Sequence, residues 1–263
     1  MKKIMSNNFR IFCALIHRDL YVVKKRLLQV WIDAAVILFI DVILWKDLIP
    51  LMGLPKSSIG PLFLGTAVSQ AFFFGMSYAF RNGADLEYDR FIDYRIILPL
   101  PKRWLFASNI TYFIIEASLV FVPFIVLGII ALGETFTVIH TSWLTIVPII
   151  ILTLALNGLM FLGCSFYYDF DWFRQNIWPR RFIFIYGTAP FFVMWYQIYN
   201  FSPRVAQCML LNPFTYTAEG LRGAIIGGDL FLSPWLCLLA LLLGCAASAG
   251  LLALGIKKRL DPV

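Results

Sequence analysis

The sequence has few of the residues that build soluble domains and enzyme sites. Charged residues make up only 14% of the 263 residues, whereas an ordinary soluble domain carries about 25%. Histidine occurs twice, and the five cysteines are scattered with no CxxC pair. We therefore expect neither a zinc site nor a disulfide framework.

Catalytic motifs are missing as well. The chain contains no GxxxxGK[ST] loop, no HExxH and no GxSxG. The first absence excludes ATP binding through a P-loop of this chain, and the others remove the usual groups of a membrane protease or hydrolase. A membrane enzyme acting on lipid would need clustered His, Asp and Arg groups, and none is apparent. We expect no catalytic residue, no bound cofactor and no metal.

Apolar residues are abundant instead. They account for 60% of the chain, and the mean hydropathy is +0.80. Several apolar runs approach 20 residues and are continuous, which predicts membrane-spanning helices and disfavours a β-barrel. We expect an all-α integral membrane protein with one domain over residues 1–263. Six spans are expected, at residues 30–49, 59–80, 104–132, 143–167, 182–199 and 234–256.

Three polar regions separate or precede these spans. Residues 7–27 form an apolar arc and a basic arc at helical spacing, which predicts an amphipathic interface helix lying among lipid headgroups. A juxtamembrane helix without any protein partner fits that pattern equally well. Residues 81–103 form a charged segment, and residues 200–232 form a helical region before the last span.

The distribution of basic residues orients the spans. Residues 1–29, 81–103, 169–181 and the tail after residue 256 hold 18 of the 22 Lys and Arg residues. The positive-inside rule then places both termini in the cytoplasm and residues 200–232 outside. The net charge of +7 is expected to meet the anionic inner membrane surface and not nucleic acid.

Three acids fall within the expected spans. Burial of a carboxylate in hydrocarbon is costly, so each should face protein, water or a basic partner. Asp33 lies near the cytoplasmic end, where it can reach water, Lys25 or Arg26. Asp41 and Glu116 lie deeper and are the candidates for lining a pathway.

A short capped helix is expected outside the membrane. Asn212 can cap its free N–H groups, and Pro213 suits the first helical position. Gly227 and Gly228 can supply a left-handed stop. Glu219 and Arg222 are three residues apart, near enough to pair on one helical face.

The charged segment 81–103 is compatible with a helix that ends at Leu98-Pro-Leu-Pro101. A charged helix held between two spans could transmit force from a cytoplasmic motor, although a solvated loop fits the composition too. Its charged candidates are Asp85, Glu87, Asp89, Arg90, Asp93 and Arg95.

These features together resemble the permease subunit of type-2 ABC exporters, the group that includes drug-resistance, nodulation-factor and polysaccharide export permeases. The most specific likeness is to that family's Asn-Pro…Tyr…Glu-x-Leu-Arg motif. The positions that match it are Asn212, Pro213, Tyr216, Glu219, Leu221 and Arg222. Residues 97–102 give a second, weaker match to the step that follows the family's coupling helix.

The resemblance implies a half-transporter in a bacterial inner membrane. Two permease chains, as a homodimer or heterodimer, would work with two separate cytoplasmic ATPase subunits that bind ATP and Mg. The ATPase would contact the charged residues of segment 81–103 together with Arg10 and Arg18, and the cargo would be an amphiphilic drug, lipid or lipid-linked glycan. The alternative is a gradient-driven transporter or channel without an ATPase, although no inverted repeat is apparent.

Overall fold

The structure is a computed structural model that describes residues 2–53, 55–90, 92, 94, 97, 101–133, 136 and 141–260. These residues form helices and no strand, which confirms the all-α prediction. Within this part of the chain, five helices are long and apolar enough to cross a membrane. They contain α1 (Lys2–Ile43), α3 (Ile59–Ala84), α5 (Lys102–Leu132), α6 (Trp143–Tyr167) and α12 (Pro234–Leu260).

Short elements extend or connect these helices. The π-helical turn η1 (Leu44–Leu48) and α2 (Ile49–Leu51) continue α1, and the 3₁₀ turn η2 (Lys56–Ser58) leads into α3. A second π-helical turn, η3 (Asp85–Asp89), continues α3 and ends at Arg90, whose φ of 52° is left-handed.

The predicted span at residues 182–199 is not one helix in the structure. The chain is helical through α7 (Phe170–Trp172), η5 (Phe173–Phe182) and α8 (Ile183–Thr188), and it becomes helical again only at α9 (Trp195–Phe201). Pro190 explains the interruption, because proline lacks an N–H and disfavours helical geometry in the residue before it. Ala189 is accordingly extended, with a ψ of 140°. We call residues 189–194 the break.

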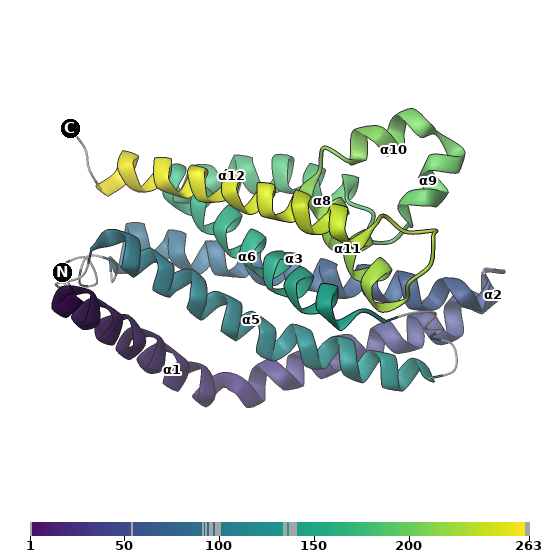
Figure 1. The fold of residues 1–263 in the computed structure, drawn as a ribbon, viewed down its shortest axis with the longest axis horizontal. Coiled ribbons are helices and arrows are strands. Elements are labelled where there is room, and N and C mark those ends of the chain that lie inside the picture. The colour runs from purple at the N-terminus through teal and green to yellow at the C-terminus, as the bar shows by residue number, and fades with distance from the viewer. Residues whose placement is uncertain are drawn as a thin grey trace.

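The predicted interface helix is not separate from the first span. Helix α1 runs without interruption through 42 residues, a length of about 63 Å at 1.5 Å per residue. This is twice the thickness of a hydrocarbon core of about 30 Å. The helix changes direction along its length (Figure 1). Its first half meets the start of α5, where the rings of Phe12 and Trp104 lie 5.5 Å apart.

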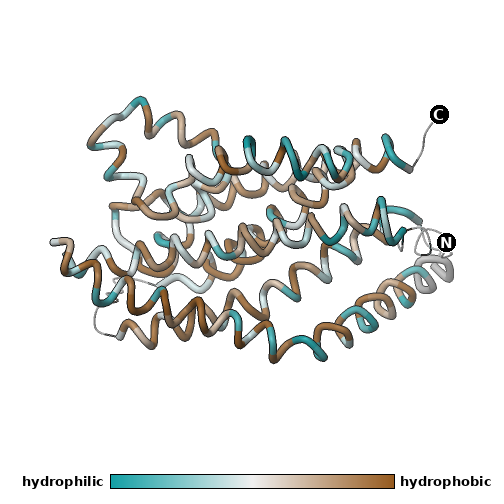
Figure 2. The backbone as a smooth tube through the Cα atoms, turned by 180° about the vertical axis from the view of Figure 1, so that it is seen from behind, coloured by the Kyte–Doolittle hydropathy of each residue, from teal (hydrophilic) through white to brown (hydrophobic). Residues whose placement is uncertain are grey.

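The helices lie roughly along one long axis, and this arrangement defines two ends of the molecule (Figure 1). The start of α1, the end of α12, η3 and the start of α5 gather at one end, which we call the terminal end. At the opposite end lie α2, α9 and α10 (Pro203–Met209), with α11 (Pro213–Ile225) beside them. Figure 2 shows teal, hydrophilic residues along the first half of α1 and near the end of α12, and long brown, apolar stretches between the two ends.

Helix α3 provides the centre of the core. Phe72 is fully buried and surrounded by other rings, with centroid distances between 4.9 and 6.3 Å. Its aromatic neighbours are Phe73, Phe161, Phe182, Tyr186, Phe191 and Phe214. Residues from α3, α6, the break and α11 therefore meet at one ring, so the packing around Phe72 holds these elements in register.

Glycine permits the close packing of α3 against α5. A Cβ added at Gly128 of α5 would overlap the ring of Phe63, which is itself fully buried and stacked on Phe124. In contrast, Gly250 of α12 has open space around its Cα.

Replacement of Gly128 by alanine should lower the free energy of unfolding by about 1–3 kcal/mol, because overpacking forces the Phe63 ring out of its position. Thermal unfolding of the purified protein in mild detergent measures the loss. Gly250→Ala is the matched control and should be neutral or slightly stabilising, since alanine is the better helix former. Equal unfolding temperatures for the two variants would contradict this packing.

Candidate functional site

Helix α11 begins and ends as its sequence predicts. The Asn212 side chain accepts a hydrogen bond from the Phe214 N–H at 3.0 Å, and Pro213 occupies the first turn. Gly227 and Gly228 have φ values of 77° and 94°, the left-handed backbone that stops the helix. The helix is largely buried, so it is a packed element of the bundle and not a surface loop.

The other side of Asn212 holds the end of α8. Its amide Nδ2 donates to the Ile185 carbonyl at 2.6 Å and to the Thr188 hydroxyl at 2.9 Å. The last carbonyls of a helix have no partner within that helix. One side chain therefore caps the start of α11 and satisfies the end of α8 at the same time.

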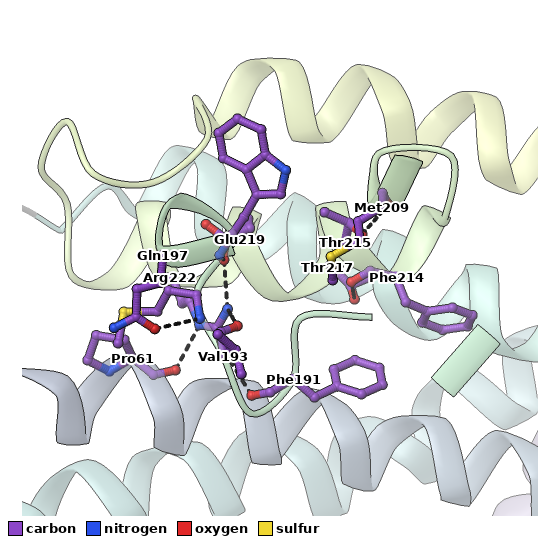
Figure 3. A network of polar contacts seen from close by, with 12 residues as sticks. Pro61, Phe191, Val193, Gln197, Met209, Phe214, Thr215, Thr217, Glu219 and Arg222 are labelled. Carbon is purple, nitrogen blue, oxygen red and sulfur yellow. Dashed lines mark hydrogen bonds and ion pairs between the residues drawn. The ribbon is translucent and has the colours of Figure 1, made fainter. Parts of the chain in front are cut away.

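Arg222 holds the break and α3 together. Its guanidinium donates to the carbonyls of Pro61 at 2.8 Å, Phe191 at 2.9 Å and Val193 at 3.3 Å (Figure 3). Two of these carbonyls belong to the break, where no helix supplies a partner, and the third belongs to the first turn of α3. The planar, fork-shaped guanidinium suits this task, because it can donate in several directions at once.

Glu219 completes the network. Its Oε1 accepts from Arg222 Nη1 at 2.7 Å and from the backbone N–H of Trp195 at 3.1 Å. Trp195 is the first residue of α9, so its N–H is one that the helix itself leaves unpaired. Asn212, Glu219 and Arg222 thus bind the backbone on both sides of the break. We call these three side chains and their backbone partners the buried polar network.

The charges of this network lie in the protein interior. Both Glu219 and Arg222 have 0% side-chain exposure. Complete burial lowers the pKa of the Arg222 guanidinium, and the Glu219 carboxylate opposes that decrease. Arginine remains protonated in proteins, and its Nη1 lies 2.7 Å from Glu219 Oε1. This geometry satisfies backbone groups, and Glu219 Oε2 has no hydrogen-bond partner among the described residues.

Gly65 of α3 allows the break to approach. A Cβ at this position would overlap the Phe191 carbonyl oxygen and the Arg222 guanidinium. Any larger residue would push the break away from α3 and separate Arg222 from its acceptors. Nothing in the sequence alone distinguishes Gly65 from the other glycines of the apolar spans.

Tyr216 and Leu221 are the remaining motif positions. Leu221 is buried in the core, and Tyr216 is half-buried against it. Both therefore contribute packing.

A second polar cluster joins three segments at the terminal end. Glu87 of η3 accepts from the Phe170 N–H at 2.6 Å and from Arg259 at 2.9 Å. Arg259 also donates to the Tyr168 carbonyl at 2.8 Å and to Asp169 at 3.0 Å. The end of α3, the connection from α6 to α7 and the end of α12 are thus linked through Glu87 and Arg259.

The other coupling candidates are distributed around this end. Asp85 is half-buried and lines a cavity of about 190 Å³ with Tyr78 and Asn109, among others. Asp89 and Arg90 are exposed. Asp93 and Arg95 lie outside the described residues.

The two basic candidates of α1 are exposed as well. Arg10 lies on the first half of the helix. Arg18 forms an ion pair with Asp19 at 2.7 Å.

The two pathway candidates lie in different surroundings. Glu116 is buried and pairs with Arg81 at 3.1 Å, beside a larger cavity between α1, α3 and α5. Asp41 is half-buried on α1 near Thr66, and its Oδ2 has no hydrogen-bond partner among the described residues. The structure therefore does not bring Asp41 and Glu116 together at one site.

Several polar contacts have no signal in the sequence. Arg259 reads there as a positive charge of the tail and Arg81 as part of a charged segment, whereas in the structure they pair with Glu87 and Glu116. The hydrogen-bond acceptors in the break are backbone carbonyls, so no residue type in the sequence marks them. Pro190, however, lies inside the expected fifth span and could have indicated the break.

Comparison of the chain with family models, with curated proteins and with solved structures finds no match.

Arg222→Ala should lower the free energy of unfolding by about 3–5 kcal/mol, because it leaves the Glu219 carboxylate buried without a counter-charge. Denaturant titration of the purified protein in detergent, followed by circular dichroism, measures the loss. Arg204→Ala removes an exposed arginine of α10 and should change stability by less than about 0.5 kcal/mol. A similar, small effect of both substitutions would show that the buried polar network does not stabilise the fold.

Proposed function

We propose that the chain is the membrane-spanning subunit of an ATP-driven exporter of the type-2 ABC kind, moving an amphiphilic substrate outward. The substrate class comprises drugs, lipids and lipid-linked glycans. The observation that carries the proposal is the buried polar network, in which three residues of the Asn-Pro…Glu-x-Leu-Arg motif bind both sides of the break. That the polar residues of the motif act together on one piece of backbone supports the proposal.

The arrangement of charge supports the same assignment. Helix η3 and the first half of α1, which carry the described residues proposed to meet the ATPase, lie at the terminal end, and the motif helix lies toward the opposite end (Figure 1). The contacts of Glu87 and Arg259 join η3 to α12 and to the α6–α7 connection. A push on η3 would therefore move three segments together. ATP and Mg would bind on separate partner subunits, and this permease would supply surfaces.

The first test is recovery of the partner. The tagged full-length chain, purified from its native membrane, should carry a P-loop ATPase in about equal amount. Asp89→Lys reverses an exposed charge of η3 and should reduce the recovered ATPase several-fold, because it opposes the electrostatic complementarity of the contact. Asp229→Lys reverses an exposed charge before α12 and should leave recovery unchanged. Absence of any ATPase, or equal recovery with both variants, would contradict the proposal.

The second test concerns orientation, since we propose that both termini are cytoplasmic in a bacterial inner membrane. Cys208 of α10 and Cys13 of α1 are both exposed. A membrane-impermeant maleimide should label Cys208 in intact spheroplasts and Cys13 only after permeabilisation. Cys208→Ser and Cys13→Ser identify the labelled residue in each case. Labelling of Cys13 alone in intact spheroplasts would reverse the proposed orientation.

A gradient-driven transporter or channel is the second candidate, and Asp41 is the observation that favours it. Acidic side chains inside membrane spans often mark proton or ion pathways, and Asp41 Oδ2 has no hydrogen-bond partner among the described residues. Reconstituted chain that conducts protons or cations with no ATPase present, and loses this flux in Asp41→Asn, would support that function instead.

A further inference from the structure

The proposed function does not use the cavity between α1, α3 and α5. Its volume is about 640 Å³, within the range of about 300–1,000 Å³ typical of ligand sites. Helix α1 packs chiefly on α5, where Trp31 Nε1 donates to the Leu119 carbonyl at 3.0 Å, and its contact with α3 is sparse. The cavity occupies the space between α1 and α3.

Charged side chains line one part of this cavity. Arg26 and Asp33 project from α1, and no ion pair joins them to another described residue. Arg81 of α3 and Glu116 of α5 face them as a pair, and the Arg81 side chain remains 48% exposed. Two positive and two negative groups therefore line the cavity, and their sum is neutral.

The remainder of the lining is mostly apolar, with the polar side chains of Gln29, Gln70 and Ser77 among it. Its largest apolar side chains are Phe73, Phe74, Phe121 and Phe124. The part of α1 that lines the cavity extends from Arg26 to Ile37, about 16 Å along the helix axis. The antiparallel part of α3 that faces it, from Arg81 to Gln70, has the same length. Arg26 and Arg81 thus lie toward the terminal end, Asp33 lies about 10 Å further along α1, and most aromatic and aliphatic side chains line the deeper part of the cavity.

We propose that this cavity binds one zwitterionic phospholipid whose head group carries a phosphate and a primary amine. The phosphate would accept from Arg26 and Arg81, because guanidinium groups bind phosphate oxygens in paired geometry. The ammonium would donate to Asp33 and Glu116, and one acyl chain would pack on the phenylalanines. A lipid with a net negative head group would leave the two carboxylates facing its charge. The proposal does not depend on an ATPase partner or on export.

The test is native mass spectrometry of the purified full-length chain, titrated with phosphatidylethanolamine and, separately, with phosphatidylglycerol of the same acyl chains. We expect one phosphatidylethanolamine to bind about tenfold more tightly than phosphatidylglycerol, since the amine adds charge-assisted hydrogen bonds. Equal affinities, or a preference for phosphatidylglycerol, would overturn the assigned lipid class. A chain whose mass spectrum shows a dimer with no bound lipid would indicate that a second copy covers the cavity, and would overturn the site.

Two pairs of variants locate the bound lipid. Ala34 lines the cavity, and its neighbour Ala35 is exposed outside it. Ala34→Trp fills the cavity and should weaken phosphatidylethanolamine binding about tenfold, whereas Ala35→Trp should leave it within about twofold. Equal effects of the two variants would place the lipid elsewhere.

The second pair of variants leaves the side-chain volume almost unchanged, so the packing around the cavity is kept. Asp33→Asn keeps the cavity volume and should reduce the preference for phosphatidylethanolamine about threefold or more. Asp47→Asn changes an exposed carboxylate further along the same helical run and should have no effect. This pair decides the outcome even if Ala34→Trp does not fold, and an unchanged preference in Asp33→Asn would overturn the role of the charged wall.

Discussion

The fold depends on one constraint. A helix is interrupted inside an apolar bundle, and the backbone groups freed there need hydrogen-bond partners. Pro190 ends the helical run after Thr188, and the interruption leaves carbonyls and an N–H without helical partners. Exposure of such groups to lipid would cost several kcal/mol each. One side chain, Arg222, supplies donors to two carbonyls of the break and one of α3. The pairing with Glu219 offsets the cost of burying that guanidinium.

This constraint explains why the polar residues of α11 are so closely spaced. Asn212 reaches the end of α8, and Glu219 reaches the start of α9, two turns further along the same helix. The helix therefore spans the interruption as a rigid support with polar contacts at both its ends. Removal of Arg222 takes a donor from the buried Glu219 carboxylate and from three backbone carbonyls together.

The sequence predicted much of this organisation, because apolar runs and helix caps are local signals. The bounds of α6 agree with the predicted span, and the cap, the proline and the glycine stop of α11 lie where they were expected. The count of six spans is not confirmed, since five apolar helices are found among the described residues. The difference lies at residues 182–199, where Pro190 interrupts the apolar run and no single helix forms. The acceptors of Arg222, the closeness of Gly65 and the cavity could not be predicted, because each depends on backbone atoms of segments far apart in the sequence.

The continuity of α1 has a mechanical consequence. A single uninterrupted helix of 42 residues carries both the basic first half and the wall that bears Arg26, Asp33 and Ile37. The helix changes direction along its length, so a change in that bend would alter the width of the cavity. A ligand that binds the cavity more tightly at one bend angle would shift the bend toward that angle by the same free energy.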